Sequence, residues 1–120
     1  MSAALRRNEL ICIHADRYVS GNRTIIHDFL GQEAHFPLGP FVLASKLRAP
    51  VCFVFALKKS NYVYHFYGNK PKKYEGRGMA GADEMLKDYV VLLEEKVKAY
   101  PEQWFNYFDF WAEPDAVFEK

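Results

Sequence analysis

The chain has 120 residues, a formal net charge of +1, two cysteines, and a composition that is 50% hydrophobic and 17% aromatic. This length suits one domain, residues 1–120, with a single hydrophobic core, and the composition excludes an intrinsically disordered chain. Because the net charge is close to zero, binding driven by the charge of the whole molecule is excluded, and we expect no nucleic-acid partner.

In chain order, residues 2–8 are predicted to end a helix. The apolar run Leu10 to Ala15 is predicted to form a strand that is buried on both faces, as in a parallel or mixed sheet. Asp16 and Arg17 would then lie at the carboxyl end of this strand, where open α/β sheets bind ligands. A turn at 20–22 precedes a second predicted strand at 24–30, which ends at Gly31 to Glu33.

The middle of the chain alternates constrained and apolar segments. Phe36 to Pro40 is predicted to be a rigid loop, because its prolines restrict the backbone and Gly39 permits conformations closed to other residues. A helix follows through Arg48, then a buried strand at 50–57 and an aromatic strand at 62–67, with a hairpin turn at 58–61 between them. These elements predict an α/β fold with a mixed, mostly parallel sheet flanked by helices.

The firmest predicted element is a helix over 83–100, because its apolar residues fall on one stripe. The residues of the stripe are Leu86, Tyr89, Val90, Leu93, Val97 and Tyr100. Pro101 stops this helix, and residues 68–81 before it form a predicted loop. An aromatic tail follows, which includes Phe105, Tyr107, Phe108, Phe110 and Trp111.

Charge and aromatic residues are unevenly placed. Six basic residues and one acidic residue give residues 58–78 a charge of +5, whereas four basic and ten acidic residues give 79–120 a charge of −6. The basic run could contact anionic headgroups or an acidic carrier protein, or it could be an ordinary solvated loop. The twenty aromatic residues exceed what so small a core can hide; a lipid face, a partner face or a missing half of the protein could each cover the excess.

No run reaches the roughly 18 to 20 apolar residues that span a bilayer, and the start lacks the pattern of a signal peptide. We therefore expect any membrane association to be peripheral. Cys12 and Cys52 lie in apolar runs and are expected to be buried, reduced thiols of a cytoplasmic protein.

Two pairs of residues near the start could carry chemistry. His14 and Asp16 lie two apart on the predicted strand and would share a face, as an acid–base couple or as two metal ligands. A third ligand is missing, so we expect no metal site, and a half-buried, hydrogen-bonded His14 is the structural alternative. Arg17 offers planar donors suited to a phosphate or carboxylate, with Asp16 orienting it, but the two could also form an ordinary ion pair.

Several short motifs occur together in one order along the chain: His14-Ala15-Asp16-Arg17, Phe29-Leu30-Gly31, Ala34 to Pro40, Leu43-Ala44, Ala49-Pro50-Val51 and Tyr100 to Phe105. In this order they resemble the C-terminal part of the lipid A biosynthesis (lauroyl/myristoyl) acyltransferases, within the lysophospholipid and glycerol-phosphate acyltransferase superfamily. The resemblance covers nearly the whole chain and implies a partial acyltransferase-type fold.

The resemblance also implies an activity: transfer of a fatty acyl group from an acyl carrier protein or coenzyme A thioester to a hydroxyl of a phosphorylated lipid, at the cytoplasmic face of the inner membrane. It implies no bound cofactor beyond that acyl donor. It assigns Asp16 and Arg17 to the block with the family's characteristic Arg, and Phe36, Pro37 and Gly39 to a second acceptor-binding block. Leu38 stands where glycerol-phosphate relatives carry Glu, which fits the lipid A subgroup.

The catalytic motif of these enzymes, His followed by four residues and then Asp or Glu, does not occur. The residues five positions after the four histidines are Val19, Gln32, Pro40 and Lys70. Three interpretations follow: the C-terminal portion of an acyltransferase without its general base, a non-catalytic lipid- or partner-binding module, or a small enzyme that uses His14 with Asp16. If strands are missing, the exposed sheet edge is expected to cause self-association.

Overall fold

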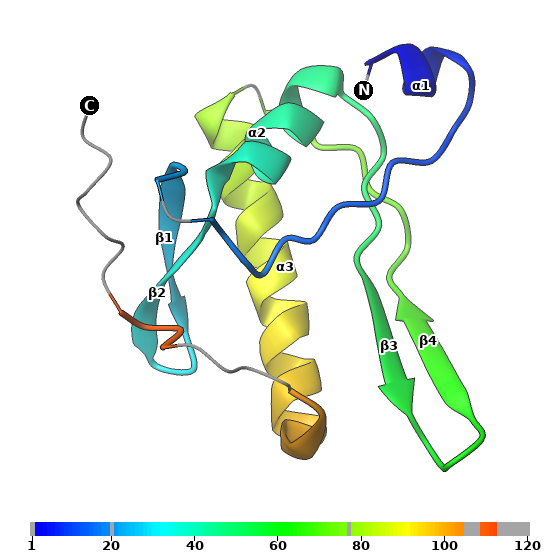
Figure 1. The fold of residues 1–120 in the computed structure, drawn as a ribbon. Coiled ribbons are helices and arrows are strands. Elements are labelled where there is room, and N and C mark those ends of the chain that lie inside the picture. The colour runs from blue at the N-terminus through cyan, green and yellow to red at the C-terminus, as the bar shows by residue number, and fades with distance from the viewer. Residues whose placement is uncertain (1, 20, 77, 105–108, 113–120) are drawn as a thin grey trace.

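The computed structural model describes residues 2–19, 21–76, 78–104 and 109–112, and measures 39 × 38 × 21 Å (Figure 1). Two antiparallel hairpins stand on either side of one long helix. The elements in order are α1 (Ser2–Arg6), β1 (Thr24–Phe29), β2 (Gln32–Pro37), α2 (Leu38–Leu47), β3 (Val54–Lys58), β4 (Tyr64–Gly68), α3 (Met79–Ala99) and the 3₁₀ turn η1 (Pro101–Gln103).

The expected mostly parallel sheet is wrong, although the α/β class is confirmed. β1 pairs only with β2 and β3 only with β4 within the described chain, and both pairs are antiparallel. The reason is the shortness of the connections, because parallel neighbours need a crossover of a dozen residues or more. Leu30 and Gly31 join β1 to β2 with φ values of 53° and 85°, as in the tight turns that favour hairpins.

Leu10 to Ala15 does not form the predicted strand. These residues belong to an extended segment, 9–19, that crosses α3 between the two hairpins (Figure 1). No described strand pairs with the segment, and Leu10 is 94% exposed. Apolar character predicted burial here, but a strand also needs a neighbour for its backbone hydrogen bonds.

The predicted rigid loop at 36–40 is also wrong. Phe36 and Pro37 end β2, and α2 begins directly at Leu38. Pro40 lies in the first turn of α2, where its missing N–H costs nothing because that turn has no intrahelical acceptor. The predicted end of this helix is confirmed, since Arg48 takes up the left-handed conformation with φ 52°.

The predicted stripe of the long helix is confirmed in α3, which begins four residues earlier than expected. Its buried residues are Gly81, Ala82, Met85, Leu86, Tyr89, Val90, Leu93 and Val97. They pack against an aromatic core from β1, β2 and α2 and from the end of the chain, with Phe29, Phe36, Phe41 and Phe110 almost fully buried. Residues 105–108 of the predicted aromatic tail lie outside the described residues.

Both cysteines are free thiols, but they are exposed, so their predicted burial is wrong. Cys12 lies in the uncovered extended segment. The Sγ of Cys52 lies 3.0 Å from the backbone oxygen of Asn69. Their apolar neighbours in the sequence therefore did not indicate burial.

Gly81 marks the close approach of α2 and α3. A Cβ atom at this position would collide with the Oγ of Ser45 and the backbone oxygen of Gly76. Ala is the better helix former by about 1 kcal/mol, yet overpacking of this kind costs about 1–3 kcal/mol. We therefore expect Gly81→Ala to lower the free energy of unfolding in urea titrations. Gly68→Ala is the control, because its added methyl group would lie 3.5 Å from Cys52 Sγ, an ordinary contact, and should change stability little. Equal losses of stability in both variants would contradict a steric collision at Gly81.

Candidate functional site

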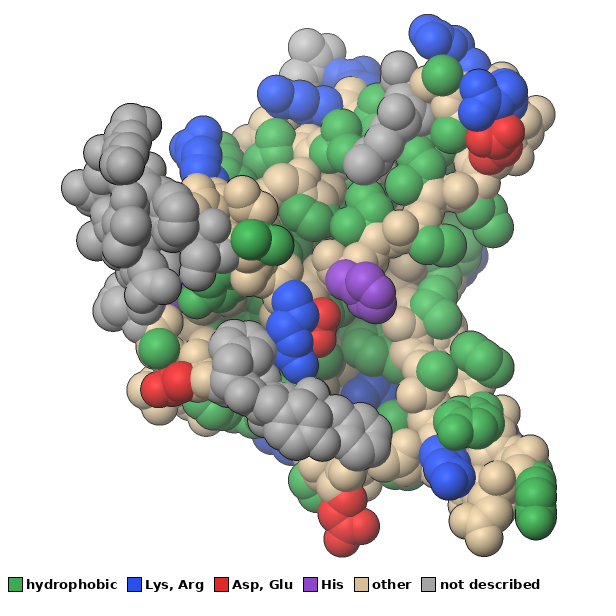
Figure 2. Space-filling model, viewed as in Figure 1, with side chains coloured by type: hydrophobic (Ala, Val, Ile, Leu, Met, Phe, Trp, Pro, Cys, Tyr) green, Lys and Arg blue, Asp and Glu red, His purple; other side chains and the backbone are tan. Residues whose placement is uncertain are grey.

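A hollow of about 570 Å³ lies between the extended segment, β3, α3 and η1, and we call it the central pocket. Its lining residues are 13–17, 52–57, Tyr89, Leu93, Lys96, Val97, Tyr100, Gln103 and Trp104. The face in Figure 2 is hollowed near its centre, with basic, acidic and His side chains close by. One helix supplies a wall because Tyr89, Leu93 and Val97 recur every four residues along α3.

Asp16 and Arg17 both line the central pocket. Arg17 Nη1 lies 3.7 Å from Asp16 Oδ2, and both side chains are partly exposed. Tyr89 also lines the pocket. Burial is the main cause of the raised pKa of its hydroxyl; the charge of Asp16 raises this pKa further, and the charge of Arg17 lowers it. The charged pair therefore lies close enough to the buried ring of Tyr89 to influence it.

Tyr89 connects the pocket to the core. Its ring lies 5.2 Å from that of Phe53 and stacks on Phe55 at 6.3 Å, and both partners belong to the pocket wall. On its other side it contacts Phe41 at 5.8 Å and Phe36 at 6.3 Å. Aromatic rings therefore form one part of the pocket lining, and charged and polar side chains form another part.

A second group of cations lies at the η1 end of the pocket. Lys96 Nζ lies 3.9 Å from the centre of the Tyr67 ring, and Lys59 Nζ donates a hydrogen bond of 2.6 Å to the hydroxyl of Tyr100. That hydrogen bond is the main cause of a lowered pKa of Tyr100. Arg17 and Lys96 therefore give the pocket lining two positive charges against the single carboxylate of Asp16.

Gln103 fixes η1 to β3. Its amide oxygen accepts a 2.7 Å hydrogen bond from the backbone N–H of Lys58, and its amide nitrogen donates one of 2.8 Å to the oxygen of the same residue. This two-point contact closes one end of the central pocket.

His14 also lines the central pocket, but it is exposed, and among the described residues no hydrogen bond or ion pair joins it to Asp16. The acid–base couple predicted from their spacing is therefore not assembled. The two residues belong to an irregular extended segment and not to a strand, so the expected shared face is absent. In the described part of the chain, no cluster of three or more His, Cys, Asp or Glu side chains is suited to a metal ion.

The second predicted acceptor block does not reach the central pocket. Phe36 and Pro37 are buried at the end of β2, and Gly39 is exposed in the first turn of α2. Phe36 nevertheless contacts a pocket residue, because its ring packs against that of Tyr89. A Cβ atom at Gly39 would meet nothing within 4 Å, so packing does not require glycine there.

Sequence reasoning did not place Lys96 and Tyr100 at the pocket that they line, and assigned them only to the end of a helix and to its apolar stripe. The available signal was the helical spacing of 89, 93, 96 and 100, which places Lys96 on the same stripe as Tyr89. The long helix within the described residues is not apolar enough to cross a membrane, nor is any other helix there.

The folded chain thus has a pocket lined by apolar and aromatic side chains together with an Arg–Asp pair. The family model for bacterial lipid A biosynthesis acyltransferases matches residues 1–111, and the chain belongs to this family. No curated protein and no solved structure matches the chain.

Proposed function

We propose that this chain forms the acceptor-binding part of an acyltransferase domain, which transfers a fatty acyl group from an acyl carrier protein or acyl-coenzyme A to a hydroxyl of a phosphorylated, lipid A-type lipid. The observation that carries this proposal is that Asp16 and Arg17 line the central pocket together with apolar side chains. An anionic headgroup and a hydrocarbon chain are thereby offered adjacent sites.

In this proposal Arg17 donates hydrogen bonds to the acceptor phosphate, and Asp16 holds the guanidinium in place. Lys96 adds positive charge from the opposite wall, while Phe53, Phe55 and Leu93 provide apolar surface for a lipid chain. The proton of the acceptor hydroxyl is removed by a His-x-x-x-x-Asp/Glu base that these 120 residues do not contain. The reaction takes place at the cytoplasmic face of the inner membrane, with the protein bound peripherally.

A second candidate function is a non-catalytic module that binds a lipid or a partner with the same surface. The absence of the catalytic motif favours this alternative, because the four histidines are followed at the required position by Val19, Gln32, Pro40 and Lys70. Both functions need the same acceptor site, so lipid binding tests what they share.

We expect Arg17→Ala to weaken binding of a phosphorylated glycolipid about tenfold or more, because a charge-assisted hydrogen bond contributes about 1.5–3 kcal/mol. Arg17→Lys should give an intermediate affinity, since the charge remains but the planar fork is lost. Isothermal titration in detergent micelles measures these affinities, with the dephosphorylated glycolipid as a second ligand that should bind wild type and Arg17→Ala equally.

Lys72→Ala is the control for diffuse charge. Lys72 lies outside the central pocket, and its ammonium is held by Glu84 at 3.2 Å and Asp88 at 3.1 Å. These carboxylates and the hydrogen bonds to them raise the pKa of Lys72, so its charge is already compensated. Equal losses of affinity in Arg17→Ala and Lys72→Ala would show that overall charge is sufficient and that no specific phosphate site exists.

A further inference from the structure

The hairpin of β3 and β4 has two chemically different faces. In an antiparallel pair, directly opposed residues share a face. Phe55 opposes Tyr67 and Leu57 opposes His65, and in β3 Phe55 is half-buried and Leu57 is buried. Residues 52–57 all line the central pocket, Val54 and Ala56 among them. The remaining pairs form the other side, which we call the outer hairpin face: Val54 with Gly68, Ala56 with Phe66, and Lys58 with Tyr64.

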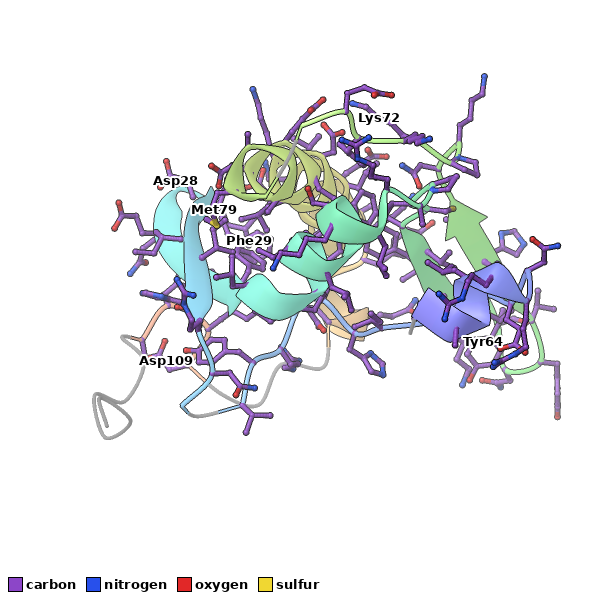
Figure 3. The ribbon with its side chains drawn as sticks, turned by 90° about the horizontal axis from the view of Figure 1, so that it is seen from above. Asp28, Phe29, Tyr64, Lys72, Met79 and Asp109 are labelled. Atoms are coloured by element: carbon purple, nitrogen blue, oxygen red, sulfur yellow. The ribbon has the colours of Figure 1, made fainter. Side chains whose placement is uncertain are left out.

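The outer hairpin face is apolar and uncovered. Phe66 is 75% exposed and Val54 63%, and Tyr64 is exposed beside them. The turn that follows β3 continues the surface with Tyr62 and Val63, both exposed. Figure 3 shows Tyr64 at the side of the molecule remote from Phe29 in the aromatic core, so this surface is not an extension of the core.

The charged residues of the hairpin and of the loop after it, up to residue 74, have one sign. Residues 34–74 contain no Asp or Glu, and five lysines lie on the hairpin and the loop after it: Lys58, Lys59, Lys70, Lys72 and Lys73. Lys59 is bound to Tyr100, and Lys72 to two carboxylates. Lys58, Lys70 and Lys73 are exposed and form no ion pair with any residue that the structure describes.

Val91, another exposed apolar residue, lacks these surroundings. It is 57% exposed on α3, which carries five carboxylates and three lysines. An anionic surface would therefore attract the hairpin more strongly than this helix. The charge pattern therefore distinguishes the outer hairpin face from a general surplus of exposed hydrophobic residues.

We propose that the outer hairpin face binds the headgroup region of an anionic lipid bilayer. Tyr62, Tyr64 and Phe66 insert at the interface, where aromatic rings are favoured, while lysines beside them contact lipid phosphates. A bilayer accounts for both features together, since burial of apolar side chains and attraction to anionic lipid add in interfacial binding.

This docking has a consequence for the site. β3 lines the central pocket, and in this proposal the outer hairpin face of the same hairpin lies on the lipid, so the pocket is held close to the bilayer. The inference deepens the peripheral membrane association proposed above, but it depends on different residues from the acceptor site.

The test is co-sedimentation of the 120-residue chain with vesicles of phosphatidylcholine, with and without phosphatidylglycerol, none containing a phosphorylated glycolipid. Wild type should bind the anionic vesicles, and added salt should weaken binding. Phe66→Ser should reduce the partition coefficient about tenfold and Val54→Ser about threefold, because each removes apolar surface from the bilayer contact. Val91→Ser, the matched change on α3, should leave binding unchanged.

A double substitution, Lys58→Gln with Lys70→Gln, should remove the preference for anionic vesicles. Arg17→Ala should still bind them, which separates this inference from the acceptor site: if it binds vesicles but not glycolipid, both proposals stand. The bilayer proposal is overturned if wild type does not bind vesicles, if Phe66→Ser binds like wild type, or if Val54→Ser and Val91→Ser lose binding equally. It is also overturned if light scattering shows that this face joins two copies of the chain, with a dimer that Phe66→Ser dissociates and that excludes vesicles.

Discussion

Phe29→Ala is expected to lower the free energy of unfolding by about 3–5 kcal/mol, a large part of the 5–15 kcal/mol typical of a folded domain. Phe29 is 0% exposed at the end of β1, and its ring contacts those of Phe36, Trp104, Phe110 and Trp111. Truncation leaves a cavity among large, stiff rings, which cannot collapse into the space. Urea titration followed by far-UV circular dichroism measures the loss.

The backbone around Phe29 adds to this sensitivity. Its carbonyl oxygen accepts a 3.0 Å hydrogen bond from the indole of Trp111, and the N–H of the next residue, Leu30, donates one of 2.8 Å to Glu94 on α3. These bonds fix β1 to the end of the chain and to the long helix. A shift of β1 into the cavity would strain both of them, so relaxation should recover little stability.

Phe66→Ala is the matched control, because it removes the same atoms from a strand residue that is mostly exposed. Its unfolding free energy should stay within about 0.5 kcal/mol of wild type. If both variants lose the same stability, the aromatic core described around Phe29 is not the main stabilising unit of the fold.

The local parts of the fold could be predicted from the sequence. The stripe of α3 is visible because every buried position recurs at helical spacing, and the tight turn before Gln32 is marked by Gly31. The sheet could not be predicted, since an apolar run such as Leu10 to Ala15 indicates extended backbone without specifying a partner strand. The prediction of a parallel sheet depended on which strands pair, and the sequence does not specify this. In the structure each strand pairs with its neighbour in sequence through a short connection, which makes the pairs antiparallel.

The site was predictable only in part. Asp16 and Arg17 were found from the motif order, and the structure places both at the central pocket. Lys96 was not found, because its relation to Arg17 depends on the path of the extended segment across α3. Tertiary packing brings together residues that are some eighty positions apart, and no local pattern carries that information.

The proposed acceptor site and the proposed membrane-binding face must be compatible with one orientation of the chain on the bilayer. If the outer hairpin face lies on the bilayer, the central pocket, which β3 lines, lies near the membrane surface. An acceptor lipid then needs only a short displacement to place its phosphate at Arg17. In this proposal the basic residues of 58–78 lie toward the anionic lipid.

The 120-residue chain alone is expected to give no acyl transfer that can be measured above a protein-free control, because no general base, a group that contributes about 10²–10⁴ in rate, is assembled at its pocket. Incubation with acyl-coenzyme A or acyl carrier protein thioester and a phosphorylated glycolipid, followed by chromatography of the lipids, measures the transfer. His14 is the candidate general base to test, because it lines the central pocket.

His14 is poorly arranged for this role. It makes no hydrogen bond to Asp16 within the described structure, and the carboxylate of Asp16 faces Arg17 at 3.7 Å instead. A base without an orienting carboxylate activates a hydroxyl weakly. His14→Ala and Asp16→Asn should therefore leave the background rate unchanged, whereas glycolipid binding by His14→Ala should equal that of wild type. Measurable turnover that either substitution abolishes would instead identify a small enzyme with His14 as its base, and would contradict the assignment of this chain to acceptor binding alone.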